Sequence, residues 1–227
     1  MSEQRRKTAS ELREIVFNDL RSNDDAARAA FEREYGNYVP DFVDATISAL
    51  DLWGQFRDTI DDTDGRRITI SALAFTSINL NISSYKLFMS GHTVASASLF
   101  RQVLEGVSLA FLCSAKSLTV LDRFIEDKYS IKKAVTEIAK HAKRAHVNRR
   151  ALQTLIDQYE FYHQYAHLTK LTIAATASIS QGGIPVVGAH FDPGKAREYG
   201  KEARSRVSFA KILPDFMRGI TESVASW

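Results

Sequence analysis

GHTVASASLFRQVLEGVSLAFLCSA, residues 91–115, is the stretch that decides the fold of this 227-residue chain. It is almost entirely apolar or small, yet Arg101 and Glu105 lie one helical turn apart near its middle. Desolvating a charged pair inside an apolar helix costs free energy, so such a pair needs a structural or a functional reason. The stretch therefore predicts a central helix that carries either a structural ion pair or part of a site.

The surroundings of this stretch extend the same pattern. Only four of the 54 residues from 68 to 121 are charged, although charged residues make up 25% of the whole chain. Ser90-Gly91 interrupts the segment, which predicts an antiparallel hairpin of two helices, about 69–89 and 92–114. Because so few charges are present, we expect other helices to surround this hairpin. The four charged residues are Lys86, Arg101, Glu105 and Lys116.

Helical periodicity and end signals predict the remaining elements. The expected helices are 8–34 with a break near 22–25, Pro40 to about 61, 118–141, 147–169, and a last helix that starts at Asp192-Pro193 and is interrupted at Pro214. The β-branched residues around Gly182-Gly183 predict a small non-helical insert near 172–191, either a hairpin or an ordered loop. The sequence thus predicts an all-α fold, a single bundle of six or seven helices with one small insert.

Charge is distributed unevenly along the chain. Residues 1–64 carry 8 Lys/Arg against 15 Asp/Glu, whereas residues 65–227 carry 22 against 12. We expect an acidic N-terminal helical arm packed on a basic bundle core, within one domain. A basic body attracts an anionic partner, but it can equally hold its own acidic arm or a second copy of the chain as a homodimer.

Several classes of protein are disfavoured. The single cysteine, Cys113, forms no disulfide within the chain and indicates a reducing compartment, and its apolar neighbours predict an unreactive buried thiol. The first residues, MSEQRRKTASELRE, lack the apolar segment of a secretory signal, and no run is long and uncharged enough for a membrane span. We expect a cytoplasmic protein without membrane association.

The Arg101–Glu105 pair has two interpretations. At 100° per residue Ser98, Arg101 and Glu105 share one narrow stripe that faces other helices. Arg before Glu at this spacing is the weaker order for simple helix support. The pair is either a buried ion pair that sets helix register, or an Arg held by Glu105 and directed at a phosphate or another anion.

A second group of polar side chains lies in YEFYHQYAHLTK, residues 159–170. The apolar stripe of this helix predicts that His163 and His167 point inward, with Tyr162 beside them. An inward histidine is a general acid or base, a metal ligand or a hydrogen-bonded core residue. We expect one cluster to form from Arg101, Glu105, Tyr162, His163 and His167.

The motif around His163 indicates whether this helix could bind a metal ion. Glu160-x-x-His163 matches one half of the carboxylate and histidine set of di-iron bundles, but the second half and the two further carboxylates are absent. No metal site is expected, and no cofactor-binding motif is present.

A basic segment follows the predicted hairpin. Residues 128–150 hold eight Lys/Arg and one acid, Glu137. The segment is either an anion- or nucleic-acid-binding surface or a solvated helix face. Tyr129 is its only aromatic residue, so stacking on single-stranded nucleic acid is not indicated. The candidate anion-binding residues are Lys140, Lys143, Arg144, Arg149 and Arg150.

These motifs together resemble known families. The segment ASLFRQVLEGVSLAFLC, followed by YEFYHQYAHLT and a Gly-Gly stretch ending in GAHFD, resembles bacterial helical-bundle families of unknown function over roughly residues 70–210. Those families show an R-x-x-x-E helix and a later Y-x-x-x-S/H-x-Y-x-H segment, and they are distantly similar to the HEPN (higher eukaryotes and prokaryotes nucleotide-binding) superfamily. The resemblance implies an all-α, often dimeric protein, and many HEPN domains are metal-independent ribonucleases of toxin or phage-defence systems.

The chain departs from the HEPN pattern at one point. The hallmark of that superfamily is an Arg followed by a His one to two turns later on the same helix, and no Arg here has that partner. Under the resemblance, Arg101 and His167 would have to meet across two helices.

Two functions follow from the sequence. The first is a non-catalytic binding or interaction module for an anionic ligand, RNA or nucleotide-like, or for a partner protein. The alternative is a HEPN-like metal-independent ribonuclease. In that enzyme His163 or His167 moves the proton of the attacking 2′-hydroxyl, Arg101 stabilises charge on the phosphate, and Glu105 orients Arg101.

Overall fold

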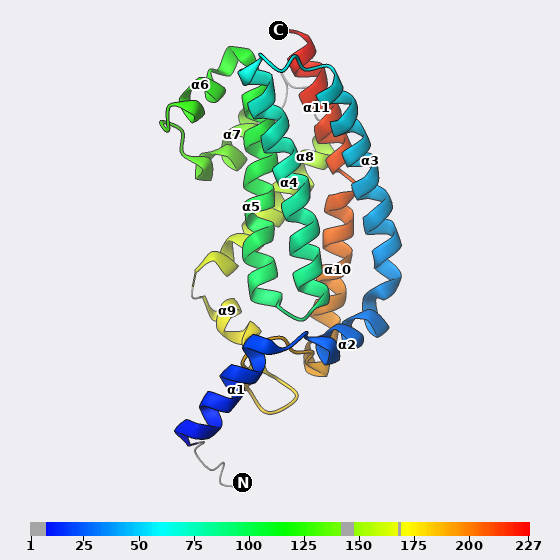
Figure 1. Cartoon of the computed structure of the whole chain (residues 1–227), viewed down its shortest axis with the longest axis vertical. Coiled ribbons are helices and arrows are strands. Elements are labelled where there is room, and N and C mark those ends of the chain that lie inside the picture. The colour runs from blue at the N-terminus through cyan, green and yellow to red at the C-terminus, as the bar shows by residue number, and fades with distance from the viewer. Residues whose placement is uncertain (1–7, 142–147, 168) are drawn as a thin grey trace.

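The computed structural model describes residues 8–141, 148–167 and 169–227, and most of them are helical (Figure 1). The helices are α1 (Ala9–Arg21), α2 (Asp25–Tyr35), α3 (Val39–Asp58), α4 (Gly65–Met89), α5 (Thr93–Ser114), α6 (Val120–Ile125), α7 (Ala134–His141), α8 (Arg149–His163), α9 (Lys170–Ala175), α10 (Ala196–Ala210) and α11 (Leu213–Ala225). The strands β1 (Ala177–Ser178) and β2 (Ile184–Pro185) form a small antiparallel pair. The expected all-α bundle is confirmed.

The α4–α5 hairpin is the centre of the bundle, as predicted. The turn between the helices needs Gly91, which has a φ of 85° and where an added Cβ would lie only 3.0 Å from Ala27 Cβ. The hydroxyls of Ser84 and Ser96 each donate to the other residue's carbonyl across the helix pair, at 2.9 and 2.7 Å. At Gly106 an added Cβ would lie 2.5 Å from Ser77 Oγ. Small residues and serines thus allow the two helices to pack closely.

Two groups of helices cover the inner side of this hairpin. α3, α10 and α11 pack along one side, and α7 and α8 pack along the other (Figure 1). Phe100 of α5 contacts the rings of Tyr162 and Phe209 at centroid distances of 4.7 and 5.1 Å. Phe111, about three helical turns further along α5, contacts the Phe216 ring at a centroid distance of 6.1 Å. The core is therefore built around α5, which is buried on one face in its first half and on all faces from Val107 to Ser114.

The expectation that helices surround the hairpin on every side is wrong for one face. Figure 1 shows α4 and α5 at the front of the molecule with no described helix over them. Phe75 and Ile82 of α4 are 40% and 39% exposed, and Asn79 and Gln102 are exposed beside them. Uncharged polar side chains tolerate water, so a lack of charge does not by itself require burial.

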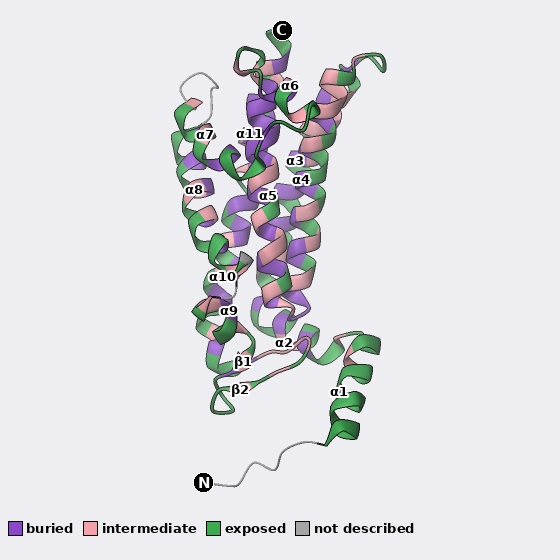
Figure 2. Ribbon diagram, turned by 90° about the vertical axis from the view of Figure 1, so that its left-hand side faces the viewer, coloured by how far each residue is buried: buried purple, intermediate pink, exposed green. Residues whose placement is uncertain are grey.

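The N-terminal arm divides into two parts. Asp24, with a φ of 58°, ends the predicted helix 8–34 at the expected break and separates α1 from α2. α2 and α3 bury Phe31 and Phe42 against the bundle, whereas α1 buries no residue and projects from the lower end of the molecule (Figure 2). Only the α2–α3 part of the arm packs as expected.

Two further boundaries differ from the predictions. The helix expected over 118–141 is divided into α6 and α7, because Asp127 between them adopts a left-handed backbone angle that a continuous helix does not accommodate. The insert near 172–191 contains the hairpin, but α9 occupies its beginning. Asp192 caps the turn before α10 by accepting from Gly194 N at 2.9 Å, as predicted. Within the described ranges no helix has the length and apolarity that crossing a membrane requires.

Candidate functional site

The Arg101–Glu105 pair forms on α5 as the sequence suggests. Arg101 Nη2 donates to Glu105 Oε1 at 2.8 Å, and the two side chains are 13% and 12% exposed. Tyr159 of α8 donates its hydroxyl to the same oxygen at 3.3 Å, and the Arg101 guanidinium carbon lies 5.9 Å from the Tyr159 ring centre. The pair is therefore a partly buried link between α5 and α8.

The predicted inward orientation of the two histidines is wrong. The buried face of α8 contains Leu155, Gln158 and Tyr162, which places His163 on the outer side of the helix. Helix α8 ends at His163, and His167 is extended after a 3-10 turn, so both imidazoles are exposed. The buried face of α8 is therefore displaced by one residue from the face that the sequence predicts to point inward. Aromatic residues occur on both faces of this helix, so their spacing did not distinguish the two.

The predicted cluster is only partly assembled. The ring centre of His163 lies 5.7 Å from that of Tyr159, with the two rings tilted, and the ring centre of His167 lies 5.3 Å from that of His163. Arg101, Glu105, Tyr159 and the two histidines thus form a row from α5 along α8, which we call the α5–α8 row. Tyr162 is fully buried on the other side of α8 and does not belong to it.

The chemistry of the α5–α8 row follows from this geometry. One Arg101 nitrogen is held by Glu105, and its Nε is buried without a hydrogen-bond partner among the described residues. The exposed imidazoles of His163 and His167 are accessible to a ligand in solution. The row can bind an anion at its exposed end, and it can exchange protons there.

Sequence reasoning missed the most buried charge in the described chain. Arg206 of α10 is 0% exposed and donates through Nε and Nη2 to Glu202 Oε1 at 3.1 and 2.8 Å. Its Nη1 donates to Ser84 Oγ at 2.5 Å, and its guanidinium carbon lies 4.7 Å from the Phe100 ring centre and 5.4 Å from that of Tyr162. Arg206 therefore ties α10 to α4, α5 and α8.

A sequence signal for Arg206 existed. Glu202 precedes Arg206 by four residues, the favourable order for a helical ion pair. Tyr199, Ala203 and Val207 then place Arg206 on the apolar face of its helix. The helical spacing in α10 is therefore sufficient to predict that this pair lies inside.

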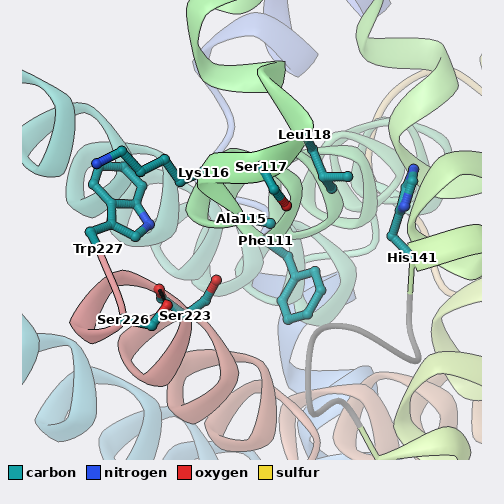
Figure 3. Close-up of a pocket in the computed structure, with 9 residues that line it drawn as sticks. All are labelled: Phe111, Ala115, Lys116, Ser117, Leu118, His141, Ser223, Ser226 and Trp227. Carbon is teal, nitrogen blue, oxygen red and sulfur yellow. Dashed lines mark hydrogen bonds between the residues drawn. The ribbon is translucent and has the colours of Figure 1, made fainter.

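The basic segment leads to a cavity at the end of the bundle that contains the C-terminus. Lys140, Arg149 and Arg150 are exposed, while Lys143 and Arg144 lie outside the described residues. A cavity of about 410 Å³ opens where α7 ends, and Figure 3 shows Lys116, His141 and Trp227 around it. An adjoining hollow of about 550 Å³ shares Lys116 and Trp227 with it. We call the two hollows together the terminal cavity.

The charges of the terminal cavity are only partly compensated. Arg66 forms hydrogen bonds with Asp122, which raise the pKa of Arg66 and lower that of Asp122. Arg67 lies 3.4 Å from Asp64. The Lys116 ammonium lies 5.7 Å from the Trp227 ring centre and forms no ion pair within the described ranges.

Trp227 has a defined position in this cavity. Its Nε1 donates to the carbonyl of Ser114 at 2.8 Å, which anchors the ring at the end of α5. Lys116 and Arg66 both approach the same indole, at 5.7 Å each. An aromatic surface flanked by cations is therefore present in the structure.

No protein-family model, no curated protein and no solved structure matches this chain.

Proposed function

We propose that this protein is a non-catalytic binding module that takes a nucleotide-like anion in the terminal cavity. The observation that supports this proposal is that Lys116, which has no ion-pair partner among the described residues, and Trp227 are shared by two adjoining hollows. The ammonium suits a phosphate oxygen, and the indole offers a surface for a planar base. Arg66 strengthens the positive potential beside that surface.

The surroundings favour an anion over a cation. Lys140 directly precedes His141 in α7, and Arg149 and Arg150 begin α8. Exposed positive groups near a recessed site raise the local concentration of anions and speed their association, an effect that salt weakens. Binding by this module is thus expected to be salt-dependent.

Calorimetric titration with AMP tests this function. Lys116→Gln removes the ammonium and is expected to weaken AMP binding about tenfold, while Trp227→Leu weakens AMP more than inorganic phosphate. Lys86→Gln is the matched control, because Lys86 is an exposed lysine near the opposite end of α4. Equal affinity of the Lys116→Gln variant and the control for AMP would contradict the assignment.

The ribonuclease interpretation is the second candidate function, and the exposed histidine pair of the α5–α8 row favours it. In this function His167 removes the proton of a 2′-hydroxyl while that oxygen attacks phosphorus, and Arg101 stabilises the charge on the phosphate. The P–O5′ bond breaks, which leaves a 2′,3′-cyclic phosphate, and the departing 5′-oxygen takes a proton from water. Incubation of labelled RNA with the protein in EDTA tests it. Cleavage that is lost in His163→Ala and His167→Ala variants supports it, and intact RNA with the wild-type protein excludes it.

We infer that a second copy of this chain is the partner protein, and that it packs on the outer face of α4 and the first half of α5, which carries few charges. The exposed centre of this face consists of Phe75, Asn79, Ile82 and Gln102. Lys86, one turn after Ile82, is an exposed charge on this side of α4, and the centre of the face is uncharged. An amide both donates and accepts a hydrogen bond, so the centre of the face is complementary to itself.

The size of this face is adequate for a dimer. α4 has 25 residues and is about 37 Å long at ~1.5 Å per residue, and two adjacent helices span about 20 Å. The projected area is therefore at most about 700 Å², with Arg66, Arg67 and Lys86 toward its ends, against ~800 Å² per subunit in a standard interface. Exposed apolar side chains on such a face are typical of an interaction surface.

A further inference from the structure

A cavity of about 480 Å³ lies between α8, α9 and α10. Figure 1 shows α9 at the lower end of the bundle, whereas the C-terminus, which borders the terminal cavity, is at the upper end. The volume falls within the range of small-molecule sites. The cavity shares no residue with the terminal cavity or with the α5–α8 row. It is therefore a separate candidate site.

Apolar side chains with accessible surface line this cavity. Phe161 of α8 and Ile179, which follows β1, are 44% and 58% exposed. Tyr165 and Leu171 keep part of their surface, and Ala174 of α9 is exposed. The ring centres of Phe161 and Tyr165 lie 5.8 Å apart. Apolar surface gathered in a recess favours a ligand with a substantial apolar part.

One charged side chain at this cavity is buried. Lys195, in the 3-10 turn that precedes α10, is 8% exposed. Its Nζ donates to the carbonyl of Ala175 at 3.0 Å, and Ala175 lines the cavity as well. An ammonium has three protons, and Nζ forms no other hydrogen bond with the described residues, so two of its donors are uncommitted. A buried ammonium normally has an anionic partner.

Two of the nearby carboxylates have cations of their own. Glu198 and Glu202 line the cavity from α10. Glu198 lies 2.8 Å from Lys201, and Glu202 lies 2.8 Å from Arg206. Neither forms an ion pair with Lys195 in the described structure. These two carboxylates therefore leave the charge of Lys195 uncompensated.

Asp192 is the third carboxylate near Lys195. It attracts the ammonium without forming an ion pair with it, because its oxygens accept from the backbone N–H groups of Ile179, Ser180 and Gly194. The attraction raises the pKa of Lys195, but burial outweighs it and lowers that pKa below its ordinary value. The ammonium thus keeps a desolvation cost that an additional anion beside it would reduce.

We propose that this cavity binds an apolar monocarboxylate, with its carboxylate at the Lys195 ammonium and its apolar part against Phe161 and Tyr165. The carboxylate accepts the uncommitted Nζ protons and supplies the missing counter-charge, and burial of the apolar part adds to the affinity. A single negative charge matches a single unpaired cation, whereas Glu198 and Glu202 disfavour a multiply charged ligand. This ligand differs in class from the nucleotide-like anion of the terminal cavity, and neither site depends on the other.

Three probes test the chemistry of the ligand. Calorimetric titration of the full chain would use 1-naphthoate, its neutral amide 1-naphthamide, and acetate, which lacks the apolar part. We expect 1-naphthoate to bind at least about tenfold more tightly than 1-naphthamide, because a charge-assisted hydrogen bond is lost in the amide. Acetate should bind about a hundredfold more weakly than 1-naphthoate. Equal affinity of 1-naphthoate and either other probe, or no binding of 1-naphthoate, would overturn the proposal.

A lysine variant tests the position of the carboxylate. Lys195→Met keeps a long apolar side chain and removes the charge, so the affinity for 1-naphthoate should fall to that for 1-naphthamide, while 1-naphthamide itself binds as before. Lys116→Gln, in the terminal cavity, is the matched control and should keep the preference for 1-naphthoate. A preference that is lost in Lys116→Gln and kept in Lys195→Met would place the ligand in the terminal cavity and contradict the proposal.

A steric variant tests the same site without changing Lys195. Ala174→Trp fills the cavity from α9 and is expected to abolish binding of 1-naphthoate. Ile173→Trp is its control, since Ile173 is an exposed neighbour on the same helix that does not line the cavity. Circular dichroism shows whether each variant is folded. Unchanged 1-naphthoate affinity in the folded Ala174→Trp protein would show that the ligand binds elsewhere.

Discussion

At the scale of single residues, Arg206 is the residue of the described chain whose burial is expected to affect stability most. A fully buried guanidinium has lost all contact with water, and Glu202, Ser84 and the Phe100 ring replace it. Removing one member of such a group leaves the other charge buried without a partner, whereas replacing both with apolar residues is often tolerated. The same argument applies less strongly to Arg101 and Glu105, which keep some exposure.

Arg206→Ala is therefore expected to destabilise the protein strongly. The free energy of unfolding should fall by about 3–5 kcal/mol, because the Glu202 carboxylate is left unpaired. Urea denaturation followed by circular dichroism measures it, with Arg204→Ala, at an exposed position on the same helix, as the control. The double change Glu202→Leu with Arg206→Leu should recover much of the loss. A loss below about 1 kcal/mol for Arg206→Ala would show that the pair contributes little.

At the scale of elements, Asp192 organises the segment between the β-hairpin and α10. Its carboxylate accepts from the backbone N–H groups of Ile179 at 2.5 Å, Ser180 at 3.2 Å and Gly194 at 2.9 Å. Desolvation opposes its ionisation, but these hydrogen bonds and that of the Ser180 side chain outweigh it and hold the pKa at about 2. One side chain thus fastens β1 to the start of α10.

The pH dependence of stability follows from this low pKa. A carboxyl whose folded pKa is below its unfolded value of about 3.9 stabilises the fold above that value, and the stabilisation is lost as pH falls toward 2. Asp192→Asn should lower the melting temperature at pH 7 and reduce the loss of stability between pH 4 and pH 2. Thermal unfolding monitored at several pH values compares the variant with the wild type. Parallel curves for the two proteins would mean that Asp192 is not the group that titrates.

At the scale of the whole molecule, the bundle has one covered and one uncovered side. α3, α7, α8, α10 and α11 pack on the inner side of the α4–α5 hairpin, and the outer side is exposed along the middle of α4 and the first half of α5. Trp53 of α3 covers part of Phe75 at its edge, and α5 is buried from Val107 to Ser114. An exposed face with few charges suits association with an identical face.

Light scattering after size-exclusion chromatography is expected to show a dimer. Ile82→Lys places a charge in the uncharged centre of this face and should produce a monomer with an unchanged circular dichroism spectrum, since Ile82 is 39% exposed. Ile125→Lys, at a 54% exposed position on α6, is the control and should remain dimeric. A wild-type monomer at high micromolar concentration would contradict the inferred interface.

The sequence by itself determined most of the elements and their order, but not the division of 118–141 into α6 and α7 or the separate helix α9. The turn at Gly91, the break at Asp24 and the cap at Asp192 were all readable, because backbone conformation and capping depend on nearby residues. The ion pair of Arg101 with Glu105 was readable for the same reason, since both residues are on one helix.

Only the tertiary structure decided which helix faces are covered. α8 carries aromatic or histidine residues on two adjacent faces, and local spacing could not show that Tyr162 lies inside while His163 lies outside. In the same way, the scarcity of charge in α4 and α5 did not show that part of one face stays open. No local pattern placed Lys116 beside Trp227. Burial is a property of what packs against a residue, and those neighbours are distant in sequence.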